Sequence, residues 1–135
     1  MDTPTILLLG LLAHLAGDYL LQSTWMAAGK TERWTPALAH AAAYGLPFLA
    51  LTRSPAALAV IVGTHAVIDR YRLARHACWA RNQLAPKAHR PPTSAIKGNG
   101  GFGPTVPAGL VTAMVICSDN SIHLLINSAA LTWLR

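Results

Sequence analysis

Four mainly apolar stretches run along the chain, separated by polar segments. They cover about residues 4–27, 35–52, 54–75 and 106–134. A helix that crosses the hydrocarbon core of a bilayer needs roughly 20 residues, and these stretches reach or approach that length. No ten-residue stretch alternates between apolar and polar residues as barrel strands do. The pattern therefore predicts an all-α fold, an integral membrane bundle of about four transmembrane helices in one domain over residues 1–135.

Individual residues within the stretches refine the predicted helices. Gly45 and Pro47 predict a kink in the second helix, because proline removes a helical hydrogen bond. Ser54 followed by Pro55 is typical of a helix start. Prolines and glycines between 77 and 105 predict an irregular loop after a short helical extension. The first stretch lacks the basic start of a secretory signal peptide, so we expect it to be retained as a helix.

The composition favours a bilayer environment. Only 12% of the residues are charged and 53% are hydrophobic. A soluble domain usually carries about 25% charged residues, and a short chain has too much surface to hide so much apolar area from water. We therefore expect the lipid bilayer as a partner and the cell (inner) membrane as the location, with the chain crossing it several times.

The distribution of basic residues predicts an orientation. Alternating helices place the loop after the first helix and the 77–105 loop on one side, with nine basic residues: Lys30, Arg33, Arg70, Arg72, Arg75, Arg81, Lys87, Arg90 and Lys97. The opposite side carries Arg53 and Arg135. The positive-inside rule then predicts a cytoplasmic 77–105 loop and two outward-facing termini. Because this rule accounts for the basic loop, we do not expect nucleic acid as a partner; binding to acidic lipid stays open.

Ionisable residues occur inside the apolar stretches in a regular pattern. They form three pairs with a separation of four: His14 with Asp18, His65 with Asp69, and Asp119 with His123. Residues at i and i+4 share a helix face, so each pair can point toward one site. The order of the pair is reversed on the last helix, which should run in the opposite direction. We therefore expect three carboxylates in one layer and three imidazoles about one turn away, roughly 5–6 Å.

This pattern predicts a polar site inside the bundle that holds a metal ion. Carboxylates in lipid need a partner, and no Lys or Arg lies in the central parts of these helices; Arg70, next to Asp69, faces elsewhere. Imidazoles and carboxylates together suit zinc, manganese or iron, and the donors suffice for one or two ions. The predicted ligands are His14, Asp18, His40, His65, Asp69, Asp119 and His123. A hydrogen-bonded polar core between helices is the alternative.

Two further polar residues extend the faces of the pairs. Gln22 lies one turn beyond Asp18, and Asn127 lies one turn beyond His123. Residues in such positions often orient metal ligands through hydrogen bonds. Polar side chains that pack helices together occupy the same positions equally well.

Four segments of the sequence resemble a known family. They are LLAHLAGDYLLQSTWMAAGK at 11–30, ALAHAAAYG at 37–45, GTHAVIDRYR at 63–72 and ICSDNSIHLLINSAAL at 116–131. They resemble the small phage and bacterial membrane-protein family known as domain of unknown function 3307, over the whole chain except the 77–105 loop. The resemblance implies a membrane-embedded protein of a kind that is frequent in phage genomes. The family is loosely similar to families labelled membrane-bound metal-dependent hydrolases.

Three functions fit these observations. The first is a metal-dependent membrane hydrolase on a lipid-linked or phosphorylated substrate, with Asp18, Asp69 or Asp119 as the candidate catalytic residue. The second is a transporter or channel for a metal ion or a proton, with the same residues as a relay. The third is a non-catalytic phage-type membrane protein with a structural polar or metal site. Assembly into a homo-oligomer stays open.

Overall fold

The computed structural model describes residues 2–134, which are all-helical, with 76% of the chain in helices and no strand in the described part. The predicted all-α fold is thereby confirmed. The chain divides into two compact units, the first formed by residues 2–71 and 123–134 and the second by residues 72–122. Arg135, one of the two basic residues predicted on the outer side, lies outside the described residues.

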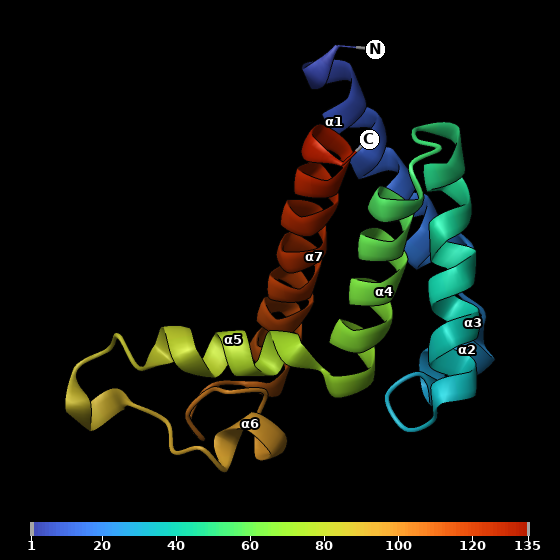
Figure 1. Ribbon diagram of the computed structural model, residues 1–135. Coiled ribbons are helices and arrows are strands. Elements are labelled where there is room, and N and C mark those ends of the chain that lie inside the picture. Colours follow the sequence, from blue (N-terminus) through green and yellow to red (C-terminus); the bar gives the residue numbers. More distant parts are fainter. Residues whose placement is uncertain (1, 135) are drawn as a thin grey trace. The chain divides into compact units, whose positions relative to one another are not determined.

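Unit 1 contains most of the helices (Figure 1). In chain order they are α1 (Thr3–Leu15), the π-helix η1 (Ala16–Leu20), α2 (Thr24–Gly29), α3 (Trp34–Gly45), the 3₁₀-helix η2 (Leu46–Ala50), α4 (Pro55–Tyr71) and the C-terminal part of α7 (Ala108–Trp133). Unit 2 contains α5 (Leu73–Asn82), the 3₁₀-helix η3 (Lys87–His89), α6 (Ala95–Gly98) and the N-terminal part of α7.

Side-chain caps begin three of the helices in unit 1. The Asp2 carboxylate accepts a hydrogen bond from the backbone N–H of Thr5 at 3.2 Å, and this contact lowers the pKa of Asp2. Ser23 caps α2, and Ser54 accepts from the N–H of Ala57 at 3.3 Å at the start of α4. Each cap satisfies a backbone donor that has no partner within the helix. The helix start predicted at Ser54 is therefore confirmed.

The first predicted helix, over 4–27, is divided. The N–H of Leu21 donates to the carbonyl of Ala16, five residues earlier, so the chain makes a widened π turn. Ser23 then adopts an extended backbone and caps α2 as a separate element. The prediction of one continuous helix was wrong here, because apolar composition does not show where a backbone hydrogen-bond register changes.

The next two predicted helices differ in their ends. The kink predicted near Gly45 and Pro47 is confirmed, since α3 ends at Gly45 and continues as the 3₁₀-helix η2. The helix predicted over 54–75 ends at Tyr71, because Arg72 has a left-handed backbone with φ 52° and ψ 47°. This conformation interrupts a right-handed helix, and α5 begins at the next residue.

The interior of unit 1 combines an apolar core with buried polar side chains. In this unit α1, α3, α4 and the C-terminal part of α7 lie side by side (Figure 1). Tyr44, Phe48, Ile61 and Leu131 are fully buried at their centre. Four histidines are also fully or almost fully buried: His14, His40, His65 and His123. Large apolar side chains face outward instead, among them Leu8, Leu12, Leu20, Leu38, Leu46 and Leu125.

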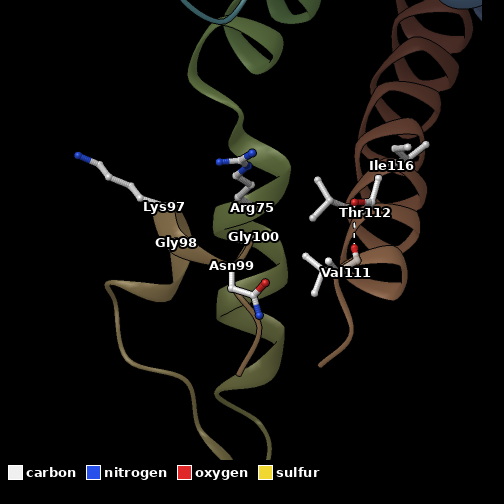
Figure 2. A pocket seen from close by; sticks show the side chains of 10 residues that line it. Arg75, Lys97, Gly98, Asn99, Gly100, Val111, Thr112 and Ile116 are labelled. Carbon is white, nitrogen blue, oxygen red and sulfur yellow. Dashed lines mark hydrogen bonds between the residues drawn. The ribbon is translucent and has the colours of Figure 1, made fainter. Parts of the chain in front are cut away.

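Unit 2 is more ordered than the irregular loop predicted over 77–105. The Trp79 indole donates to the carbonyl of Pro91 at 3.2 Å, and Asn82 donates to the carbonyl of Gly101 at 2.9 Å. Gly101 has φ 89°, and a Cβ there would lie 2.5 Å from the Trp79 nitrogen, so only glycine fits. A cavity of about 260 Å³ lies beside this loop; Figure 2 shows Arg75 of α5 and Val111 of α7 among the side chains around it.

Two helices of the described chain are long and apolar enough to cross a membrane. They are Thr3–Leu20, which includes the π turn, and Ala108–Trp133. The helices α3 and α4 have 12 and 17 residues and are shorter. Length and composition therefore identify two of the four predicted spans.

Candidate metal centre

Four ionisable side chains meet in the interior of unit 1, and they come from three parts of the chain. Asp18 lies in the π turn after α1, and His40 lies in α3. His65 and Asp69 lie one turn apart in α4, which brings both to the same face. All four are buried, and each contributes one nitrogen or oxygen within 4.8 Å of the others.

Gly17 allows the π turn to approach α3 closely at this point. A Cβ on Gly17 would lie 2.8 Å from both the Cδ2 atom and the carbonyl oxygen of Tyr44. Any side chain would therefore separate the two helices. The absence of a side chain at Gly17 brings the next residue, Asp18, within 3.2 Å of His40 on α3.

The donor atoms are spaced as closely as the ligands of one metal ion. The Nε2 atoms of His40 and His65 are 2.9 Å apart. Asp18 Oδ1 lies 3.2 Å from His40 Nε2 and 3.9 Å from His65 Nε2, and Asp69 Oδ2 lies 3.3 Å from each of the two nitrogens. A tetrahedron with metal–donor distances of about 2.0–2.1 Å has donor–donor distances of roughly 3.3 Å. The four donor atoms can therefore hold one divalent ion with little movement of their own.

The chemistry of the donors also suits a divalent ion. Two imidazoles and two carboxylates form a mixed nitrogen and oxygen set, which zinc, manganese and iron accept. Asp69 Oδ2 is buried, and three nitrogens lie 2.7–3.3 Å from it, those of Lys30, His40 and His65. A carboxylate oxygen in this position can serve as a metal ligand.

The expectation that the buried carboxylates have no Lys or Arg partner was wrong. Lys30, the residue that follows α2, places its Nζ atom 2.7 Å from Asp69 Oδ2 and 4.0 Å from Asp18 Oδ1. The same atom is 3.3 Å from His40 Nε2. Lys30 does not lie in the central part of a predicted helix, but its side chain reaches the site from the connection after α2.

Arg70 fixes the connection that carries Lys30. Its guanidinium donates to the carbonyl of Thr31 at 2.7 Å. It also lies 5.8 Å and 5.7 Å from the ring centres of Trp34 and Tyr71, within the range of cation–π attraction. Arg70 therefore attaches the segment between α2 and α3 to the end of α4 and, as predicted, does not face the carboxylates.

Tyr44 is the main supporting residue that the sequence analysis missed. Its ring stacks on His65 with centroids 3.6 Å apart and planes 7° from parallel. Its hydroxyl lies 2.9 Å from His14 Nδ1 and accepts a hydrogen bond from Asn127 at 2.6 Å. Asn127 thus supports the site through Tyr44. The signal in the sequence is that Tyr44 follows His40 by four positions, and so lies on the same face of α3.

Three further predicted residues of unit 1 lie around the four donors: His14, Gln22 and His123. His123 Nε2 is 3.5 Å from the second oxygen of Asp69, and His123 Nδ1 is 3.3 Å from His65 Nδ1. The His14 ring is centred 6.0 Å from that of His123, and His14 is not one of the four grouped donors. Gln22 donates to the backbone carbonyl of Asp18 at 3.0 Å. Asp119 lies one turn before His123, in the part of α7 that belongs to unit 2.

Comparison with known proteins places the chain in a family. Residues 6–88 match the family described as protein of unknown function, DUF3307. The chain belongs to this family. The matched region includes all four grouped donors and Lys30, so the DUF3307 region contains the candidate centre. Among curated proteins and among solved structures, none matches the chain.

Proposed function

We propose that this DUF3307 protein is a multi-pass membrane protein in which α1, α3, α4 and α7 form the four spans. The distribution of side chains in unit 1 supports this proposal. Leu20 and Leu125 are 80% and 72% exposed, whereas His40 and His65 are fully buried. A soluble protein buries its leucines and exposes its ionisable residues. The reverse arrangement is stable where lipid surrounds the bundle.

The proposed orientation has the 77–105 segment in the cytoplasm and both termini outside. The bias of nine basic residues to two supports it, because lysine and arginine accumulate in cytoplasmic loops. Basic side chains of unit 2 such as Arg75 and Lys97 would then face the anionic inner leaflet.

We further propose that the protein binds one divalent metal ion through Asp18, His40, His65 and Asp69. The convergence of four donor atoms at tetrahedral spacing carries this proposal. Buried carboxylates and imidazoles in lipid are costly, and an ion that binds all four compensates that cost.

The reaction that we propose is hydrolysis of a lipid-linked or phosphorylated substrate. A divalent ion supplies Lewis acidity for such a reaction. His123 supports this choice, because it lies 3.5 Å from the oxygen of Asp69 that is not among the four donors. An imidazole held beside a carboxylate in this way can accept a proton from a water molecule while the carboxylate stabilises its charge. We assign His123 this role as the general base.

A proton relay is the second candidate function. The imidazoles of His40, His65 and His123 form a chain with nitrogen–nitrogen distances of 2.9 Å and 3.3 Å. Asp18 lies at one end of this chain, 3.2 Å from His40. Successive titratable groups at hydrogen-bond distance can pass a proton along a membrane protein.

Metal analysis of the purified protein tests the proposed centre. Wild-type protein extracted in detergent from metal-supplemented cells should carry close to one zinc, manganese or iron ion per chain. The variants His65→Ala and Asp69→Ala should lose most of this metal, because each removes one of four ligands. His76→Ala and His89→Ala are matched controls from unit 2 and should retain it. Wild-type protein without metal after such growth would reject the centre.

Reconstitution in vesicles separates the two functions. A hydrolase should release phosphate from a phosphorylated lipid, and His123→Ala should reduce that rate at least tenfold while metal content is maintained. A proton relay should acidify or alkalinise the vesicle lumen under an applied potential without any hydrolysis. Proton flux with no hydrolysis would replace the first function with the second.

A further inference from the structure

The side chain of Lys30 lies in the candidate centre, although Lys30 is not one of the four proposed metal ligands. Its ammonium group contacts Asp69 Oδ2 at 2.7 Å, lies 3.3 Å from His40 Nε2 and is 4.0 Å from Asp18 Oδ1. It therefore approaches three of the four donor atoms. The ammonium carries one positive charge, which offsets one of the two carboxylate charges in this arrangement.

The ammonium and a divalent ion compete for the same lone pairs. An ion bound at about 2.0–2.2 Å from the donors would use the oxygen and nitrogen electron pairs that now face Lys30. It would also place two positive charges within a few ångströms of a third, in a buried site where screening is weak. The two cations therefore exclude each other, and Lys30 has to withdraw before an ion can bind.

The position of Lys30 allows that withdrawal. Its side chain is 18% accessible, whereas that of Asp69 is 4% accessible. Lys30 follows the short helix α2, and its backbone is anchored independently because Arg70 binds the carbonyl of the next residue, Thr31. A flexible four-carbon stem can turn outward while the backbone stays in place.

We propose that Lys30 is an internal competing cation that regulates metal occupancy of the Asp18–His40–His65–Asp69 centre. This inference rests on the proposed metal centre. Lys30 pairs with the carboxylates when metal is scarce, and a divalent ion displaces it when metal is abundant. The protein thereby keeps the buried acids paired in both states, and its metal affinity is lower than the ligands alone would provide.

Zinc titration of three proteins tests the competition. Wild type, Lys30→Met and the control Lys97→Met are stripped with a chelator in detergent and titrated with Zn²⁺ against a chromophoric chelator. Methionine retains the apolar length of the side chain without its charge. Lys30→Met should bind zinc at least about tenfold tighter than wild type, and Lys97→Met should match wild type. Equal or weaker binding by Lys30→Met would overturn the proposal.

Labelling of the wild-type protein provides a second measurement that requires no folded variant. An amine-reactive acylating reagent is applied with and without saturating Zn²⁺, and modification of Lys30 and Lys97 is quantified by mass spectrometry. Zinc should increase modification of Lys30 severalfold, because the displaced ammonium becomes accessible. Lys97 should not change. Unchanged or decreased modification of Lys30 in zinc-loaded protein would show that the ammonium is not displaced.

The results distinguish failure of this inference from failure of the metal centre. Zinc bound equally by wild type and Lys30→Met would retain the centre and reject the competition. Zinc binding by Lys30→Met but not by wild type would support both the metal centre and the competition. If neither protein bound zinc, manganese or iron, the centre itself would be wrong, and Lys30 would be a permanent partner of Asp69.

Discussion

Substitution of Gly17 tests the packing that positions the candidate centre. In Gly17→Ala, the new Cβ would lie 2.8 Å from the Cδ2 atom and from the carbonyl oxygen of Tyr44, and 3.0 Å from its Cα. Two of these three contacts involve backbone atoms, which cannot rotate away. Because ordinary contacts begin at 3.4 Å, the π turn and α3 must separate by at least about 0.6 Å.

The expected effects follow from this separation. Forced overpacking of a close interface costs about 1–3 kcal/mol, so the variant should melt several degrees below wild type. Asp18 is the next residue and should move with the π turn. Metal sites tolerate errors of only about 0.2 Å in ligand position, so zinc affinity should fall at least tenfold.

Gly63→Ala is the matched control. Gly63 lies in α4, and a Cβ there would meet no atom within 4 Å. This variant should be as stable as wild type or up to about 1 kcal/mol more stable, because alanine favours a helix. Both variants are compared by thermal unfolding in detergent and by zinc titration. If Gly17→Ala matched Gly63→Ala in both measurements, the close approach of η1 to α3 would be wrong.

Three further predictions concern other contacts. Tyr44→Phe should cost about 1–2 kcal/mol of stability in thermal unfolding, because His14 and Asn127 lose a hydroxyl partner. Its zinc affinity should stay within about threefold of wild type, since the ring that stacks on His65 remains; a larger loss of affinity would show that the hydroxyl orients a ligand. Arg70→Ala should lower the melting temperature through loss of the Thr31 hydrogen bond and the two ring contacts, whereas the exposed control Arg53→Ala should not; equal melting would contradict the role of Arg70. Reporters fused within 77–105 and after the C-terminus should give a cytoplasmic and an outward signal, respectively, and a cytoplasmic C-terminal signal would reject the proposed orientation.

Several features of unit 1 could be predicted from local sequence patterns. Apolar stretches predicted an all-helical chain, and Pro47 and Ser54 predicted a kink and a helix start that the structure contains. The separation of His65 and Asp69 by four placed them on one face of α4. These features depend on residues within one or two turns of each other, so backbone geometry alone is sufficient to predict them.

Only the tertiary structure decided which side chains surround the carboxylates. Lys30 contacts Asp69 across 39 positions of sequence, and Tyr44 stacks on His65 across 21. The π turn after α1 also separates the environment of His14 from that of Asp18, although a regular helix would align them. Contacts of this kind depend on how helices pack and on where a connecting segment is anchored. The sequence by itself determined that ionisable groups lie within the helices. The packing of α2, α3 and α4 determined that a lysine also lies among these groups, because a long side chain can reach a site that its own helix does not form.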